Sequence, residues 1–118
     1  MRIFISHAGE DAKVAAELAQ AITGHGHDVI WRDSASNALE NAEAMVVLVS
    51  ARTTDSPFVL REIEFALEEP RFAKRLIPVV IGSTSRAPWI LRKLKSFTAG
   101  NDLAQTGRRV AEALEKTA

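Results

Sequence analysis

The stretch "AMVVLVS" (residues 44–50) decides the fold, because six apolar residues follow one another in it without a charged side chain. A continuous apolar run of this length is typical of a strand in a parallel sheet that is covered on both faces. Other runs rich in β-branched residues predict four further strands: "RIFIS" (2–6), "DVIWR" (28–32), "LIPVVI" (76–81) and a weak one near 96–98. Pro78, inside the fourth run, is tolerated at a sheet edge or a bulge and is unfavourable in a central strand.

Three helices are predicted around these strands. Apolar side chains at four-residue spacing within 10–26 indicate a helix that ends near Gly24. Ser56, a hydroxyl N-cap, followed by Pro57 at the first helical position marks the start of a second helix, which the next proline ends. An amphipathic pattern over 102–118 predicts a third helix, which closes the chain.

Length and composition indicate one domain, 1–118. The 118 residues are 47% hydrophobic and 25% charged, which is enough for one ordinary core and leaves no room for a second. Fifteen basic residues balance fifteen acidic ones, so no overall field favours nucleic acid or a membrane as a partner. Cysteine is absent, which excludes disulfides, thiolate metal sites and cysteine nucleophiles. With no signal peptide and no apolar run of about 20 residues, we expect a soluble cytoplasmic protein or a domain of a longer one.

Strands that alternate with helices predict an α/β fold, in which right-handed crossovers build a doubly wound parallel sheet. For the common strand order 2-1-3-4-5, ligands bind where the order reverses, beyond the carboxyl ends of the first and third strands. The loops there, 6–11 and 50–56, each lead into a helix whose free N–H groups favour a phosphate or carboxylate. We therefore expect a small anionic ligand such as a nucleotide. The alternative is a crevice that is empty or used for protein contacts.

Glu62 has an unusual position in the second predicted helix. At about 100° per residue it falls at the shoulder of an apolar stripe, between Phe58 and Ala66. Burial beside apolar side chains raises the pKa of a carboxylate unless a donor or a cation compensates, and such positions are often functional. The structural alternative is a cap or a salt bridge, with Arg32 or Arg52 as the partner.

Taken in order, these segments resemble the Toll/interleukin receptor and resistance family, the TIR domain, from residue 2 to about 82, with a weaker continuation to 114. "RIFISHAGED" resembles the first strand and loop of the family, "VIWRD" its second strand, "AMVVLVS" its third, "SPFVLREIEFAL" its Ser-x-Trp-x-x-x-Glu helix and "LIPVVI" its fourth strand. The resemblance, to the prokaryotic type, implies a flavodoxin-like sheet of five strands in the order 2-1-3-4-5 with helices on both faces.

Many prokaryotic and plant TIR domains cleave NAD+ at the nicotinamide N-glycosidic bond, often in antiviral defence or cell-death signalling. The resemblance thus implies an NAD+ glycohydrolase or cyclase with Glu62 as the catalytic carboxylate, NAD+ as a substrate rather than a cofactor, and other TIR domains as partners in homotypic assembly. It implies six further residues for the nucleotide site, in loop, stacking and floor positions: Ser6, His7, Gly9, Trp31, Ser50 and Phe58. Each of the six has a structural alternative, such as a loop hydroxyl, a capping side chain or a core ring.

The connector between the second and third strands departs from the family. Residues 33–43 have room for at most two helical turns, where family members place a longer loop and a full helix that border the nucleotide pocket. Phe58 also stands where the family often has Trp. Two other hypotheses therefore stay open: a catalytically silent TIR module that acts through protein contacts, and a nucleotide sensor that does not cleave its ligand.

Two other signals are weaker. His25 and His27 lie in a glycine turn with only Asp28 beside them, so no metal site is expected. Residues 71–95 contain seven basic side chains and no acidic one, which indicates a solvated face with the capacity to attract an anionic partner or a neighbouring copy.

Overall fold

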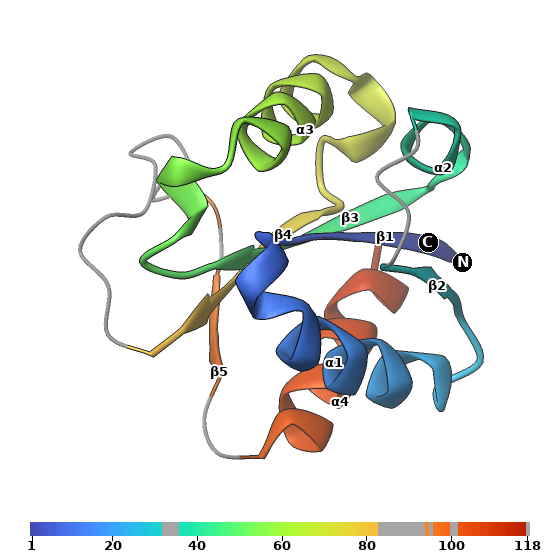
Figure 1. Cartoon of the computed structure of the whole chain (residues 1–118). Helices are drawn as coiled ribbons and strands as arrows, with labels where there is room; N and C mark the ends of the chain where they lie inside the picture. Colours follow the sequence, from blue (N-terminus) through green and yellow to red (C-terminus); the bar gives the residue numbers. More distant parts are fainter. Residues whose placement is uncertain (32–35, 83–93, 95, 100–101, 118) are drawn as a thin grey trace.

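Five strands form one parallel sheet in the order β2-β1-β3-β4-β5 (Figure 1). The computed structural model describes residues 1–31, 36–82, 94, 96–99 and 102–117. The strands are β1 (Arg2–Ser6), β2 (Asp28–Ile30), β3 (Ala44–Val49), β4 (Leu76–Ile81) and β5 (Phe97–Ala99). All six residues of the central strand β3 are buried, in agreement with its continuous apolar run. The predicted α/β class and strand order are confirmed.

Helices cover both faces of the sheet (Figure 1). On one face lie α1 (Ala12–Thr23) and α4 (Leu103–Glu115), and on the other α2 (Ser36–Asn41) and α3 (Pro57–Glu68). Three short 3-10 helices lie in the described parts of the connections: η1 (Gly9–Asp11), η2 (Thr53–Asp55) and η3 (Pro70–Phe72). Successive strand residues point to opposite faces, so Val46 of β3 packs with α1 and α4 whereas Met45 and Val47 pack with α3. The two apolar cores thus lie on either side of one sheet.

The ends of the helices follow the predicted signals. Ser56 Oγ accepts a hydrogen bond from Val59 N at 3.4 Å, and Pro57 is the first residue of α3. Helix α3 ends before Pro70, and α1 ends before Gly24. The cap fixes the first turn of α3, the helix that carries Glu62.

Two strands differ from the simplest expectation. β2 ends at Ile30, earlier than the predicted end at 32, and among the described strands it pairs with β1 alone. Pro78 lies within β4, but β5 pairs with β4 only from Val79 to Ile81. In the described part of the chain, Pro78 therefore has a partner strand on one side only, and this is where a missing N–H is tolerated. No helix in the described ranges combines the length and apolarity needed to cross a membrane.

Helices α1 and α4 approach each other closely at Gly107. A Cβ atom added to Gly107 would lie 2.5 Å from Cβ of Ala21, well inside van der Waals contact. Glycine inside a helix is unfavourable by about 1 kcal/mol relative to alanine. At this position the missing side chain lets the two helices pack together on one face of the sheet.

Candidate active site

The carboxyl ends of β1 and β3 lie side by side where the strand order reverses. Ser6 is the last residue of β1, Ser50 directly follows β3, and both are buried. Each hydroxyl group donates a hydrogen bond to a carboxylate from another element: Ser6 to Glu62, and Ser50 to Asp11. The expected ligand position is therefore bordered by two hydroxyl–carboxylate pairs.

Glu62 reaches from α3 to the end of β1. Ser6 Oγ donates to Glu62 Oε1 over 2.7 Å. Burial is the largest influence on the pKa of Glu62 and raises it above the ordinary value of 4.5. The Ser6 hydrogen bond and the charge of His7 lower this pKa and offset the effect of burial only in part. The half-buried position expected from the helical pattern is confirmed, and the proton equilibrium of Glu62 depends on two neighbours.

The imidazole ring of His7 lies between two backbone carbonyl groups. Nδ1 is 2.8 Å from the oxygen of Ala8, and Nε2 is 2.7 Å from the oxygen of Trp31. A neutral imidazole donates from one nitrogen only, so only the imidazolium can donate to both carbonyls at once. This geometry ties the loop after β1 to the residue that follows β2 and holds the His7 ring near Glu62.

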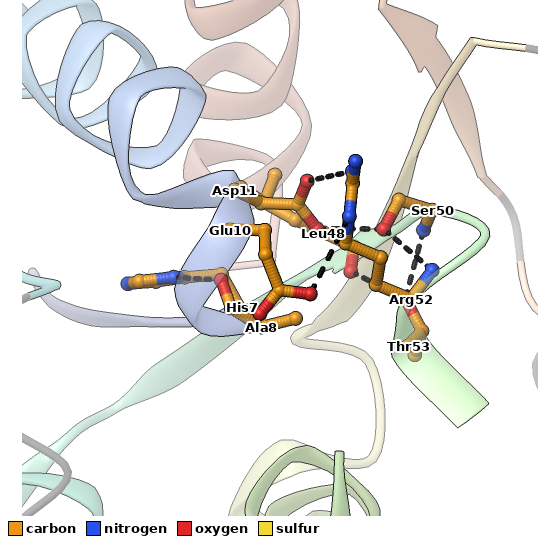
Figure 2. Close-up of polar contacts among 8 residues, drawn as sticks. All are labelled: His7, Ala8, Glu10, Asp11, Leu48, Ser50, Arg52 and Thr53. Carbon is orange, nitrogen blue, oxygen red and sulfur yellow. Dashed lines mark hydrogen bonds and ion pairs between the residues drawn. The ribbon is translucent and has the colours of Figure 1, made fainter. Parts of the chain in front are cut away.

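A second polar network joins the loop after β3 to the start of α1 (Figure 2). Ser50 Oγ donates to Asp11 Oδ2 at 2.6 Å, and Asp11 Oδ1 lies 3.6 Å from Nη1 of Arg52. The Arg52 Nε atom is also 3.4 Å from Oε2 of Glu10, whose side chain is exposed. Arg52 is thus engaged by two acids at this edge and is not the partner of Glu62. Arg32, the other partner considered for Glu62, lies outside the described residues.

Asp11 is a site residue that the sequence prediction missed. Only 5% of its surface is exposed, and its side chain accepts from Ser50 rather than from an N–H group of α1. An acid directly before a helix, in a loop that follows a buried strand, was the signal available for it. Its carboxylate lies at the positive end of α1, so this helix end already has a negative neighbour, which opposes binding of a further anion there.

Phe58 lies on the exposed side of α3, outside the stripe of buried residues; its role in stacking on a nucleotide stays a prediction. The residue is 65% exposed, and the guanidinium carbon of Arg61 lies 5.9 Å from its ring centroid. The buried residues of α3 are Val59, Ile63 and Ala66. The apolar stripe is therefore narrower than expected and centred near Val59, which leaves Phe58 about 100° away from its middle.

The remaining predicted residues divide into two groups. Trp31 is half-buried, packs against the core below α1 and α4, and meets the site through its carbonyl group. Gly9 is exposed, and a Cβ atom there would meet nothing within 4 Å, so no close contact requires a glycine. The structure thus brings Ser6, His7 and Glu62 into direct proximity, and Ser50 joins the neighbouring network through Asp11.

Metal ligands do not gather in the described part of the chain, where no group of three His, Asp or Glu side chains is arranged to hold an ion. His27, considered in the sequence as a weak metal signal, instead makes a 2.9 Å contact between its Nε2 and Oε2 of Glu115. Its Nδ1 lies 3.3 Å from the amino group of Met1.

Together these features define a class of protein: a flavodoxin-like α/β domain with a hydroxyl-bound carboxylate at its topological switch point. The sequence profile of the TIR domain family matches residues 3–116. The chain belongs to the TIR domain family.

Solved structures agree on the fold. The crystal structure of the TIR domain of the Toll-related receptor TRR-2 from Hydra magnipapillata superposes with a TM-score of 0.72 and 16% identity, covering 98% of this chain and 94% of that one. A flavodoxin variant from Pseudomonas aeruginosa superposes with a TM-score of 0.65 and 14% identity, covering 98% of this chain and 99% of that one. The pseudo-receiver domain of the CikA protein superposes with a TM-score of 0.56 and 17% identity, covering 98% of this chain and 93% of that one. No curated protein matches the sequence significantly.

Proposed function

We propose that this TIR domain is a cytoplasmic NAD+ glycohydrolase or ADP-ribosyl cyclase that takes part in antiviral defence or cell-death signalling, with Glu62 as its catalytic carboxylate. The observation that supports the proposal best is the Ser6–Glu62 pair, a half-buried acid held by a hydroxyl at the carboxyl end of the first strand. Acids in such positions are costly for folding and occur preferentially at functional sites.

The chemistry requires only one carboxylate. When the bond between nicotinamide and the ribose breaks, the electron pair leaves with the pyridinium nitrogen, so neutral nicotinamide departs without a general acid. Positive charge then develops on the ribose as an oxocarbenium ion. Water supplies an oxygen to this carbon and releases one proton, which gives ADP-ribose. In a cyclase, a nucleophilic atom of the same molecule takes the place of water.

Glu62 contributes by electrostatic stabilisation and by holding the ribose. An ionised carboxylate beside the ribose stabilises the developing charge in a partly dry site. Ser6 donates to Oε1, which leaves Oε2 to accept a hydrogen bond from a ribose hydroxyl. The charge of His7 favours the ionised form of Glu62, which is the form that the reaction needs.

A second candidate function is a silent TIR module that acts through homotypic contacts. Two observations favour it: α2 has only six residues, and Phe58 exposes its ring on α3. An exposed aromatic side chain beside an arginine is typical of residues that anchor protein interfaces.

Release of nicotinamide separates the two candidates. The protein is incubated with NAD+ at high protein concentration, which allows assembly, and the products are separated by chromatography. Glu62→Ala is compared with Glu64→Ala, which removes an exposed acid from the same helix. Release that is lost in Glu62→Ala and kept in Glu64→Ala supports the enzyme. Absence of release from the wild type, with self-association that depends on Phe58, supports the silent module.

A further inference from the structure

A cavity of about 460 Å³ opens at the opposite end of the sheet from Glu62. It lies at the first residues of β4 and β5, Leu76 and Phe97, whereas Ser6 is the last residue of β1. Leu94 and Ala113 complete its largely apolar floor. The volume falls within the range of about 300–1,000 Å³ that is common for small-molecule sites. The proposed NAD+ chemistry makes no use of this cavity.

The rim of the cavity is basic. Lys74, Arg109 and Lys116 line it, and all three are exposed. Among the described residues that line the cavity, Glu112 is the one acid. Within the described residues, none of these three cations takes part in an ion pair. Three positive charges against one negative charge produce a local field that attracts anions, although the whole chain is neutral.

The shape of the cavity is set by contacts that need no ligand. Arg75, next to the cavity, donates from Nε to Thr117 Oγ1 at 2.9 Å and from Nη2 to the Thr117 carbonyl at 3.1 Å. Thr117 Oγ1 in turn donates to the carbonyl of Leu114 at 2.6 Å. These bonds fix the end of α4 against the start of β4, so the guanidinium of Arg75 is engaged while the three rim cations stay available to a ligand.

We propose that this cavity binds a small amphipathic anion, a carboxylate or phosphate that carries an apolar tail. The tail packs on Leu76, Leu94 and Phe97, and the anionic group pairs with Arg109 and Lys116. The apolar floor selects against inorganic phosphate, and the charged rim selects against neutral or cationic amphiphiles. The concave shape and the volume of the cavity favour a small molecule over a second copy of the chain, for which a flatter surface is usual.

NMR titration of the folded protein with octanoate and octyl phosphate tests the proposal. We expect saturable amide shifts at Leu76, Phe97 and Ala113, and weaker or absent shifts with octanol, octylammonium and inorganic phosphate. Preference between the two anions identifies the head group. The double variant Arg109→Glu, Lys116→Glu should weaken binding at least about tenfold, since hydrogen bonds to charged groups are lost. The control Arg108→Glu changes the adjacent residue of α4, which lines a different cavity, and should bind as the wild type does.

Two results would overturn the proposal. One is equal affinity for octanol or octylammonium and the anions, which would mean that the basic rim plays no part. The other is a set of shifts at the same residues that depends on protein concentration alone, which would assign this surface to a second copy of the chain. Because the ligand panel uses the wild-type protein, neither result depends on whether the variants fold.

Discussion

Ser6 Oγ and Glu62 Oε1 lie 2.7 Å apart although 56 positions separate the two residues in the chain. This hydrogen bond joins the last residue of β1 to the middle of α3 across the point where strand order reverses. The bond gives the half-buried carboxylate of Glu62 a hydrogen-bond donor. It also places this carboxylate beside the carboxyl ends of the strands, where ligands bind in this fold class.

The stability of the protein should depend on pH through Glu62. Burial raises the pKa of Glu62 above 4.5, so folding favours the protonated form, and the resulting stability is present below that value and is lost as the pH rises through the folded pKa. Glu62→Gln removes the charge and keeps an oxygen that accepts from Ser6. We expect Glu62→Gln to have a higher free energy of unfolding than the wild type at about pH 7, and a smaller advantage at about pH 4, in urea titrations. An advantage that is unchanged or larger at the lower pH would contradict this account.

Removal of the Ser6 hydroxyl should raise the pKa of Glu62 further. The hydrogen bond from Ser6 favours the ionised carboxylate, so Ser6→Ala loses a contribution that lowers the pKa. Carbon-detected NMR titration of the side-chain carboxyl groups measures this shift. The carboxyl of exposed Glu64 provides the control within the same sample, and it should titrate alike in both proteins. A Glu62 midpoint that is unmoved or lower in Ser6→Ala would show that the hydrogen bond does not control this acid.

The buried Asp11 should matter more for stability than its exposed neighbour. The carboxylate of Asp11 accepts a hydrogen bond from Ser50 and pairs with Arg52, and the amide of Asp11→Asn cannot replace both interactions. We expect this variant to lower the free energy of unfolding by about 1–3 kcal/mol. Glu10→Gln removes only an exposed ion pair with Arg52 and should change the free energy of unfolding by less than about 0.5 kcal/mol. Chemical denaturation of the two variants side by side gives the comparison. Equal losses would mean that the buried network does not hold the two loops together.

Helix α4 should tolerate no side chain at Gly107. Gly107→Ala places a Cβ atom 2.5 Å from that of Ala21, and overpacking of this kind typically costs about 1–3 kcal/mol, more than the gain in helix propensity. The matched control is Gly107→Ala combined with Ala21→Gly, which removes the facing methyl group. In thermal unfolding the double variant should be more stable than additivity of the two single changes predicts. Strict additivity would indicate that the two positions are not in contact.

Much of the fold was predictable because its signals are local. The apolar run of β3, the alternation of strands and helices, and the cap formed by Ser56 and Pro57 each depend on neighbouring residues, and each is found in the structure. The shoulder position of Glu62 was predictable for the same reason, since the helical period sets it. The family resemblance then supplied an expected role, which the fold alone does not provide.

The features that were missed depend on residues distant in the sequence. The partner of Asp11 is Ser50, 39 positions away, and no local pattern records that pairing. The basic cavity likewise combines the start of β4 with the end of α4.

The initial rate of nicotinamide release from NAD+ by Glu62→Gln, measured beside Glu64→Gln at equal concentrations of folded protein, tests the catalytic role of Glu62 most directly. Both variants lose one negative charge from α3, and only the first loses the half-buried carboxylate that contacts Ser6. We predict a loss of at least about 100-fold in Glu62→Gln, the scale on which preorganised electrostatic groups act, and a rate close to that of the wild type in Glu64→Gln. Equal rates in the two variants, or no release by the wild type even in concentrated assemblies, would contradict the account.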